Sequence, residues 1–458
     1  MIGILILLVS IYLYISGNKR WSILIYLGML NNGFQVLTDR VIGIKNLDIA
    51  FIYMAIICIY SQIYEKAPKD EYGIRKHVYW LFAFMVCSVL FSYIHYGFTF
   101  TQILQGSRHL WFFMSFLFLR KLRYKDFLWI FEKLYYITLI TAVLYSIQVL
   151  FNLPVLPYTE TIEDISIDRQ TGVARYYNSP SCLIIFLIAS IVAPQLIKKF
   201  RFSRLCPFIL FIALICTQGR TNIGTTIAVI ALGILMTRKI SNYVRYALIL
   251  AIVILPFSDI LIGRFEGGKR GDTSDDFENI INGKFIDAVE RGQGAHNMGT
   301  MTYRFAWVYE RAAFLSHRPL GENLFGLGLI TDSQYDIVHR MYHFKVGLSD
   351  ERGNISQMST PDIAWGNMIS KFGYLGGILL LLLWLKLIIT FYKYRRSDLL
   401  VFVAFLSSIK LLFNSLSSAG ISATSLLGFY FCILSIIPYM IHKIKRRNET
   451  NSIQTITS

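Results

Sequence analysis

The stretch IAWGNMISKFGYLGGILLLLLWL, residues 363–385, decides the fold class of this chain. It is long and apolar enough for an α-helix that crosses a ~30 Å hydrocarbon core, for which ~20 residues suffice. Outward from it, comparable apolar blocks recur along the 458 residues. The expected spans are about 1–16, 21–38, 47–64, 78–96, 100–119, 127–151, 180–197, 204–218, 222–237, 244–263, 363–391, 398–416 and 419–441. The sequence therefore predicts an all-α polytopic membrane protein with 12 or 13 transmembrane helices.

Composition supports this class. The chain is 55% hydrophobic and only 16% charged, whereas soluble domains carry about 25% charged residues. The net charge of +17 comes from Lys and Arg gathered in short clusters on every second connection. Such spacing is the positive-inside pattern of membrane proteins. No basic helix face with interleaved aromatic residues is present, so nucleic acid is not an expected partner.

The basic clusters predict the topology. The expected cytoplasmic connections follow the first, third, fifth, seventh, ninth, eleventh and thirteenth spans. The N-terminus is then outside and the C-terminus cytoplasmic. Because Lys19 and Arg20 follow the first apolar block and no basic residue precedes it, residues 1–16 are expected to be a transmembrane helix rather than a cleaved signal peptide.

Three regions are expected from this pattern. Residues 1–263 hold ten spans and an outer loop at about 152–179. Residues 264–362 form a large extracytoplasmic loop, and 363–458 hold three spans and a basic tail. Within the large loop, SDDFENIINGKFIDAVE (274–290) and YRFAWVYERAAFLS (303–316) have helical spacing. Segments this long are rarely simple linkers, so we expect a folded helical cap.

Cysteine and histidine give no metal or disulfide signal. The six cysteines lie in or at the edges of apolar blocks and form no CxxC pair, which argues against a disulfide framework or a zinc site. His339 and His343 have the spacing of a helical pair that can chelate a metal. Without an HExxH motif the pair is weak, and we expect no metal site.

Arginines near the ends of the outer helices are the main candidates for chemistry. Arg169 and Arg175 lie in the outer loop before a helix expected to begin at Pro180, and Arg220 is the only charge in a tight outer turn. A guanidinium group suits phosphate oxygens, but these arginines could equally contact lipid headgroups or snorkel to the interface. Arg108, within an apolar run, is either an intramembrane functional residue or an interfacial one.

Two further candidates belong to the large loop and its end. Arg304 begins a predicted helix that a Pro-Leu-Gly turn follows; a surface ion pair with Glu310 or Asp336 is the alternative. Asp362 precedes the span at 363–391. It is a candidate general base at the outer face, and as a helix cap it would have an ordinary structural role.

These segments together resemble the superfamily of O-antigen polymerases and O-antigen ligases, the Wzy-like membrane glycosyltransferases. The resemblance covers about residues 100–390 and rests on RQTG (169–172) with NSP (178–180), TQGRT (217–221), RFAW (304–307), RPLG (318–321), GLG (326–328) and PD (361–362) with GYLG (373–376). Gly219 replaces the family's usual serine. Asp362 and Ile363 stand where ligases usually carry His-Asn, which favours a polymerase.

The resemblance implies a GT-C-like, metal-independent enzyme without a cofactor in the bacterial plasma membrane. Its expected substrate is an undecaprenyl-diphosphate-linked glycan, polymerised into O-antigen, capsule or exopolysaccharide, with a flippase and a chain-length regulator as partners. Arg304 and Asp362 would be catalytic, and Arg108, Arg169, Arg175 and Arg220 would bind the diphosphate or glycan. The alternatives are a ligase-type glycan transferase, a flippase or transporter of lipid-linked oligosaccharides, and a structural membrane component.

Overall fold

The computed structural model describes residues 2–37, 40–41, 44–66, 72–156, 165–167, 174–176, 179–237, 278–291, 300–348, 355–360, 362–422 and 424–440. This part of the chain is mainly helical. Its four strands are two or three residues long and form two antiparallel pairs, β1 with β2 and β3 with β4. The expected span at 244–263 lies outside the described residues.

The elements before the large loop begin with α1 (Ile2–Ile15), α2 (Lys19–Leu30), η1 (Asn32–Gln35), β1 (Arg40–Val41), β2 (Ile44–Lys45), α3 (Asn46–Tyr64) and α4 (Ile74–Tyr96). They continue with α5 (Phe100–Trp111), η2 (Phe112–Ser115), α6 (Phe116–Leu119), α7 (Tyr124–Phe151), β3 (Ile165–Ile167), β4 (Ala174–Tyr176), α8 (Leu183–Val192), η4 (Pro194–Leu196), α9 (Cys206–Cys216) and α10 (Arg220–Thr237). The described loop helices that follow include α14 (Lys284–Arg291), α15 (Thr300–Ser316), α16 (Leu320–Phe325) and α17 (Tyr335–Met341). The last elements are α18 (Ala364–Tyr394), α19 (Leu399–Asn414), η7 (Ala419–Ser422) and α20 (Thr424–Leu434).

Five of the described helices are long and apolar enough to cross a membrane, namely α3, α4, α7, α10 and α18. Shorter apolar helices include α1, α8, α9 and α19. Each expected span within the described residues coincides with a helix or a succession of short helices. The structure is therefore that of a helical protein consistent with several passages through a membrane.

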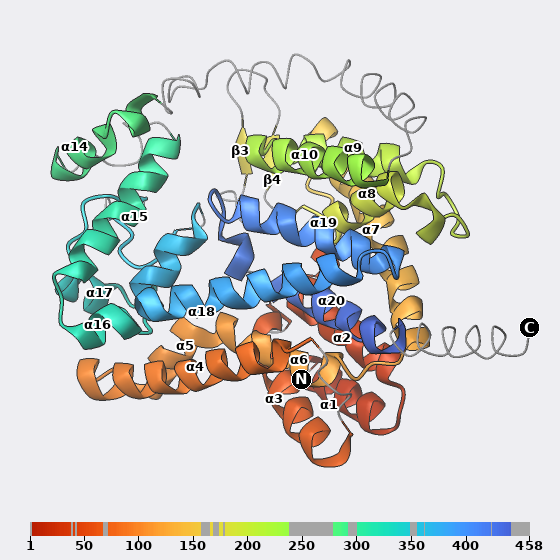
Figure 1. Cartoon of the computed structure of the whole chain (residues 1–458), viewed down its shortest axis with the longest axis horizontal. Helices are drawn as coiled ribbons and strands as arrows, with labels where there is room; N and C mark the ends of the chain where they lie inside the picture. Colours follow the sequence, from red (N-terminus) through yellow and green to blue (C-terminus); the bar gives the residue numbers. More distant parts are fainter. Residues whose placement is uncertain are drawn as a thin grey trace, which may run out of the picture.

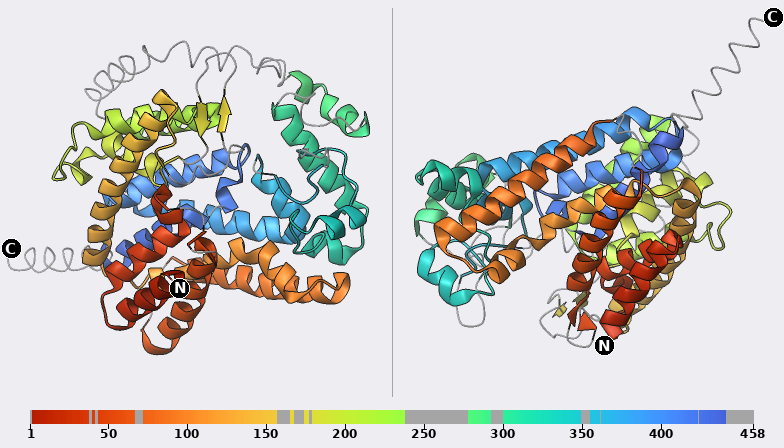
Figure 2. Two further views of the ribbon diagram at one scale, coloured as in Figure 1. Left: turned by 180° about the vertical axis from the view of Figure 1, so that it is seen from behind. Right: turned by 90° about the horizontal axis from the view of Figure 1, so that it is seen from below.

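Figure 1 shows α4, α18, α19 and α10 as long rods lying roughly side by side, with α15, α16 and α17 gathered at one end of them. The contacts agree with the picture, because α18 packs on both α4 and α19, and α19 packs on α10. Figure 2 shows the same grouping from behind and from below. We call the end of the rods that carries α15, α16 and α17 the loop-side end.

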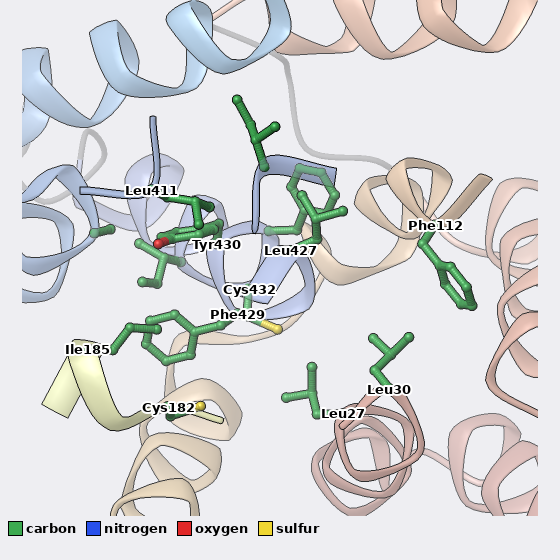
Figure 3. Packing of buried hydrophobic residues seen from close by; sticks show 14 of the residues in the cluster. Leu27, Leu30, Phe112, Cys182, Ile185, Leu411, Leu427, Phe429, Tyr430 and Cys432 are labelled. Atoms are coloured by element: carbon green, nitrogen blue, oxygen red, sulfur yellow. The ribbon is translucent and has the colours of Figure 1, made fainter. Parts of the chain in front are cut away.

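The centre of the helical bundle is filled by α20. Its Phe429, Tyr430 and Cys432 are buried, and Figure 3 shows them between side chains of α2, α8 and α19. Tyr430 also meets Trp384 of α18 edge to face, with 5.8 Å between ring centroids. Between helices in lipid, such packing replaces the hydrophobic effect as the source of cohesion.

The helix α18 is broken near its loop-side end. Gly373 has φ 64° and ψ −173°, which no helical residue adopts. A Cβ at this position would lie 2.5 Å from the carbonyl oxygen of Leu324 in α16. The backbone of the loop helices therefore docks directly onto the break.

The glycine-rich segment after α16 completes this docking. Gly326 has φ 83°, and a Cβ there would lie 2.5 Å from the carbonyl carbon of Lys371. The Leu327 amide donates to the Ser370 carbonyl at 2.8 Å, and the Tyr96 hydroxyl donates to the Gly326 carbonyl at 3.1 Å. This segment thus fixes the loop to α4 and α18.

The structure corrects several local predictions. The helix expected to begin at Pro180 begins at Leu183, and the expected span 100–119 is three short helices, α5, η2 and α6. The helix predicted at 303–316 is confirmed as α15. Of the one predicted at 274–290, the part before residue 278 lies outside the described residues, and the remainder is helical except at a turn at 282–283.

Candidate functional site

Arg304 and Asp362 lie together at the loop-side end. Nη2 of Arg304 is 3.9 Å from Oδ1 of Asp362, and its Nη1 donates to the Met301 sulfur at 3.4 Å. The arginine side chain is only 11% exposed, whereas that of Asp362 is 36% exposed. The distance is too long for a hydrogen bond. The pair is therefore a loose ion contact that leaves the carboxylate accessible to a ligand.

The chain leading to Asp362 is held by Asp332. Its carboxylate accepts hydrogen bonds from the backbone amides of Gln357, Met358 and Ser359 at 2.8–3.0 Å, and from the Ser359 hydroxyl at 2.9 Å. Charge-assisted bonds of this kind are stronger than neutral ones. Asp332 therefore fixes the path of the chain just before the candidate base.

Asn367 and Thr360 hold the turn itself. The Asn367 side chain accepts from the Thr360 amide at 2.8 Å and donates to the Thr360 carbonyl at 2.6 Å. The Thr360 hydroxyl accepts from the amide of Asp362 at 3.2 Å. The capping role considered for Asp362 is wrong, because Ile363 occupies the N-cap position of α18, without a side-chain cap. The carboxylate is thus not used to cap the helix.

Arg304 is positioned by the packing of α15 on α18. Trp307 is fully buried and lies so close to Gly366 that a Cβ there would be 2.5 Å from its ring. The Tyr374 hydroxyl of α18 donates to the Ala312 carbonyl of α15 at 2.9 Å. These contacts fix one face of α15 against the helix that Asp362 precedes.

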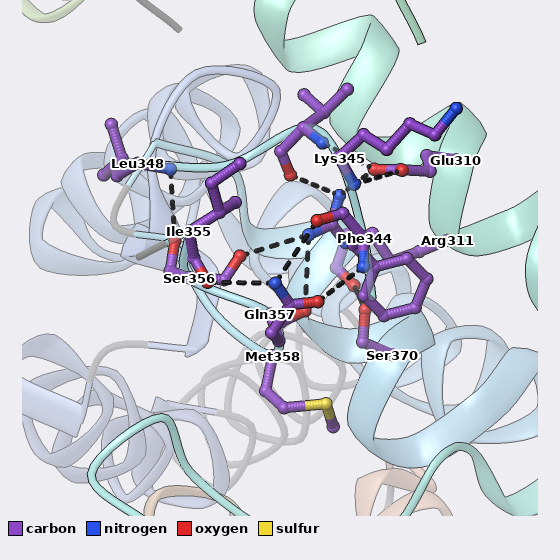
Figure 4. A network of polar contacts seen from close by, with 12 residues as sticks. Glu310, Arg311, Phe344, Lys345, Leu348, Ile355, Ser356, Gln357, Met358 and Ser370 are labelled. Atoms are coloured by element: carbon purple, nitrogen blue, oxygen red, sulfur yellow. Dashed lines mark hydrogen bonds and ion pairs between the residues drawn. The ribbon is translucent and has the colours of Figure 1, made fainter. Parts of the chain in front are cut away.

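Arg311, on the same helix, is a structural residue. Its side chain is fully buried, and it donates to Glu310 at 2.6 Å and to the Val346 carbonyl at 2.7 Å (Figure 4). It also donates to the carbonyls of Ser356 and Gln357 at 3.3 Å. Burial lowers the pKa of Arg311 to about 9, and the charge of Glu310 opposes that effect. The guanidinium therefore stays charged at neutral pH and ties α15 to the segments on either side of residues 349–354.

Arg220 is the first residue of α10 and is half-buried. Within the part of the chain that the structure describes, its guanidinium has no hydrogen-bond or ion-pair partner. Gln218, two residues earlier in the chain, donates to the Ala174 carbonyl in β4 at 3.2 Å. Arg220 is therefore a cation open to a ligand.

Arg175 is placed only through its backbone. It lies in β4, opposite Ser166 of β3, and β4 is held to α7 by the Tyr145 hydroxyl, which donates to the Tyr176 carbonyl at 2.9 Å. With the bond from Gln218, this brings the backbone of Arg175 close to the turn before α10. Arg169 lies outside the described residues.

Arg108 makes a contact that sequence reasoning did not foresee. Its Nη1 lies 2.6 Å from Oδ1 of Asp48 in the first turn of α3. Asp48 neutralises the arginine locally. Among the described residues, no contact joins Arg108 to Arg304, Asp362 or Arg220.

Sequence reasoning also missed the roles of Asp332 and Asn367 in shaping the turn at Asp362. Nothing local distinguishes Asp332 from other loop carboxylates, because its partners lie 25 to 27 residues further along the chain. The histidine pair is not on one helix, since α17 ends at Met341, before His343. Within the described residues, no group of three or more His, Cys, Asp or Glu is arranged to hold a metal ion.

The arrangement can neutralise an anion and accept a proton at one place. Arg304 offers a cation beside the accessible carboxylate of Asp362, and Arg220 offers a second cation at the start of α10. No family model matches the chain, and a search of curated proteins finds none that is significantly similar.

Proposed function

We propose that this protein is a polysaccharide polymerase of the O-antigen polymerase type, acting on undecaprenyl-diphosphate-linked repeat units at the outer face of the bacterial plasma membrane. The observation that carries the proposal is the contact of Arg304 with Asp362 at 3.9 Å. It sets a cation of a type suited to phosphate oxygens beside a candidate base, where a folded loop meets a long apolar helix.

The chemistry follows from charge. The hydroxyl oxygen of the acceptor sugar bonds to the anomeric carbon of the donor sugar, and the bond from that carbon to the diphosphate oxygen breaks. Asp362 takes the hydroxyl proton, and the diphosphate leaves with the bonding electron pair. Arg304 and Arg220 neutralise the charge that develops on the diphosphate, and arginines in a poorly solvated site are well suited to this.

The proposed architecture is GT-C-like, with thirteen spans, an outer N-terminus and a cytoplasmic C-terminus. The region 264–362 forms the extracytoplasmic cap over the site. In this arrangement a flippase supplies the lipid-linked repeat units, and a chain-length regulator is a second protein partner. The five long apolar helices and the loop helices at one end of the bundle support this arrangement.

Complementation of a deletion strain tests the proposal. Arg304→Ala, Arg304→Lys and Asp362→Asn are expressed separately, and polymer length is measured by gel electrophoresis of the extracted glycan. The matched controls are Arg340→Ala and Asp336→Asn, which change exposed residues of α17 in the same loop. Removing an electrostatic stabiliser or a general base lowers turnover by about 10²- to 10³-fold.

We expect Arg304→Ala and Asp362→Asn to leave single repeat units at normal protein level, while both controls make polymer of normal length. Loss of polymer also in Arg304→Lys points to bidentate binding of the diphosphate rather than to charge alone. Full-length polymer from Arg304→Ala or Asp362→Asn refutes the assignment. Accumulation of complete but unattached polymer in the deletion strain identifies a ligase instead.

A second candidate function is transport of lipid-linked oligosaccharide across the membrane. The observation that favours it is the break in α18 at Gly373, because transporters often bind their substrates at interrupted helices. Proteoliposomes separate the two functions. A transporter moves labelled lipid-linked oligosaccharide between leaflets without changing its length, whereas a polymerase makes longer products from it.

A further inference from the structure

Lys410 is a buried cation within the apolar helix α19. The residue is only 6% exposed, and its ammonium group donates to Oδ1 of Asn222 in the first turn of α10. Two further side chains complete the group. Asn414 donates to the same Asn222 oxygen at 3.5 Å, and the Thr225 hydroxyl donates to Asn414 at 2.8 Å.

This cluster contains a charge without a countercharge. An ammonium group has three donors, and the acceptor found for Lys410 is a neutral amide. In the described part of the chain, no carboxylate forms an ion pair with it. A cation among membrane helices is costly and normally pairs with an acid or serves a ligand. The cluster therefore lacks an anion.

Arg220 adds a second cation on the same turn of α10. It is two residues from Asn222 on the first turn of α10 and has no partner among the described residues. Lys410 approaches the same turn from α19. Two separate helices thus carry positive charge near the start of α10.

The cluster lies just inside the bundle from the candidate base. Lys410 is four residues before Asn414, which ends α19, or about 6 Å along a helix axis. Ser415 follows; its carbonyl accepts from the Ala364 amide at 3.4 Å, and its hydroxyl accepts from the Trp365 indole at 2.9 Å. The end of α19 is therefore fixed to the residues after Asp362, with Lys410 about one turn deeper.

We infer that Lys410 and Arg220 hold the diphosphate of the polyprenyl-linked substrate. This inference rests on the proposed function. It assigns different parts of the substrate to two depths in the helical bundle. The lipid diphosphate binds at the level of Lys410, at the ends of α10 and α19. The sugar-linked end of the diphosphate then reaches Arg304, and the sugar that it carries lies beside Asp362 under the loop helices.

Binding to the purified full-length protein in detergent tests this inference. The probe is undecaprenyl diphosphate, with undecaprenol as the uncharged control and phosphatidylglycerol as a lipid with one phosphate. Affinities are measured by native mass spectrometry for the wild type, Lys410→Met, Lys410→Arg and Lys386→Met. Lys386 is the matched control, because it is a half-buried lysine in the apolar helix α18, where it lies beside Gly73.

We expect Lys410→Met to weaken undecaprenyl diphosphate binding at least tenfold, Lys410→Arg to retain most of it, and Lys386→Met to change nothing. Inorganic pyrophosphate should compete with undecaprenyl diphosphate for binding to the wild type, and it should not compete for binding to Lys410→Met. Unchanged affinity in Lys410→Met overturns the inference, as does an equal loss for phosphatidylglycerol or undecaprenol. Because Lys410→Arg keeps the charge, its retained binding separates a ligand role from general damage to folding.

The outcome of this binding test is independent of the outcome of the complementation test of the proposed function. A wild-type protein that makes no polymer but binds undecaprenyl diphosphate through Lys410 overturns the polymerase and leaves the binding site standing. Polymer of normal length from Lys410→Met, with unchanged affinity for the diphosphate, overturns the binding site and leaves the polymerase standing.

Discussion

Two arginines of α15 have different surroundings and therefore different expected roles. Nη2 of Arg304 lies 3.9 Å from Oδ1 of Asp362, whose side chain is partly exposed. Arg311 instead donates to backbone carbonyls and to Glu310. Both terminal nitrogens of the Arg311 guanidinium are bonded within the protein, so they do not face a ligand. Arg311 thus serves folding, whereas Arg304 lies beside the partly exposed carboxylate of the candidate base.

Arg311→Met tests this distinction. The variant removes a donor from the carbonyls of Val346, Ser356 and Gln357 and leaves Glu310 without its cation. Breaking such a buried pair costs about 3–5 kcal/mol. We expect a clear fall in the melting temperature of the purified protein and faster proteolysis around residues 342–360. Arg304→Met is the comparison and should melt close to the wild type while making no polymer. Equal melting temperatures of Arg311→Met and the wild type contradict the structural role.

Arg108 and Asp48 form a pair whose members should depend on each other. We expect Arg108→Gln and Asp48→Asn to destabilise the protein by less together than the sum of the single changes, with a coupling of about 0.5–1 kcal/mol. Because Asp48 neutralises Arg108, polymer of normal length should persist in Arg108→Gln. Chemical denaturation in detergent and glycan gels measure the two effects. Additive stability changes with loss of polymer only in Arg108→Gln would restore Arg108 to the substrate site.

Residues of the candidate site could be predicted only where the neighbouring sequence has a recognisable pattern. Asp362 follows a proline directly before an apolar block, and Arg304 begins a segment with helical spacing, so both could be chosen from the sequence. Asp48 lies 60 residues from Arg108, and Lys410 is a single cation inside an otherwise apolar run. Their partners come from tertiary packing, which no local pattern encodes.

At the scale of elements, the docking of the loop onto α18 depends on two glycines with left-handed backbones. Replacing Gly373 or Gly326 by Ala places a Cβ 2.5 Å from backbone atoms of the opposing segment, in a conformation that costs an L-residue about 1–2 kcal/mol before any clash. We expect both variants to loosen the loop helices, measured as faster hydrogen exchange in residues 320–348. Gly377→Ala is the control, because no atom lies within 4 Å of its Cβ position.

The control variant is expected to change stability in the opposite direction. Gly377 is in a helical part of α18, where Ala is favoured over Gly by roughly 0.5–1 kcal/mol. Gly377→Ala should therefore melt at or slightly above the wild-type temperature. If Gly373→Ala and Gly326→Ala also leave exchange unchanged, the loop is not held by this backbone contact.

Helices were the most predictable elements, and their interruptions the least. Apolar blocks of membrane length located the helices because a chain in lipid must satisfy its backbone hydrogen bonds within the segment. The break at Gly373 depends on α16 lying against it, and the bends in 100–119 depend on packing against α3. The short β3–β4 hairpin lies in a polar loop that had no strand signal.

For the whole molecule, the order of helices in space matters more than their order in the chain. Figure 1 shows the row α4, α18, α19 and α10. Contacts between its helices and the loop bring Asp362 near Arg304 and the end of α19 near the start of both α10 and α18. Hydropathy gives the segments that enter the membrane but not their neighbours. From the sequence, the convergence of these residues was only a hypothesis. The described contacts give its geometry at three places, where Arg304 meets Asp362, where α10 meets α19 and where the end of α19 meets the start of α18.

The proposed topology decides whether this end of the bundle meets lipid-linked sugars outside the cell. Lys and Arg gather on alternate connections, and such loops remain cytoplasmic because of the positive-inside bias. In a variant with the native cysteines replaced by Ser, Asp336→Cys reports on the loop helices and Ser16→Cys on the α1–α2 turn. Both positions are exposed. An impermeant maleimide should label Asp336→Cys in intact spheroplasts and Ser16→Cys only after permeabilisation.

The native cysteines are replaced because Cys87 is exposed on α4, and the cysteine-free protein without either new cysteine controls for background labelling. Comparable labelling of both positions after permeabilisation shows that each is chemically accessible. The reverse pattern, with Ser16→Cys labelled in intact spheroplasts and Asp336→Cys protected, places Arg304 and Asp362 on the cytoplasmic side. Translocated repeat units could not then reach the site. This labelling pattern would refute the polymerase proposal by itself, even if both residues proved essential for polymer in the complementation test.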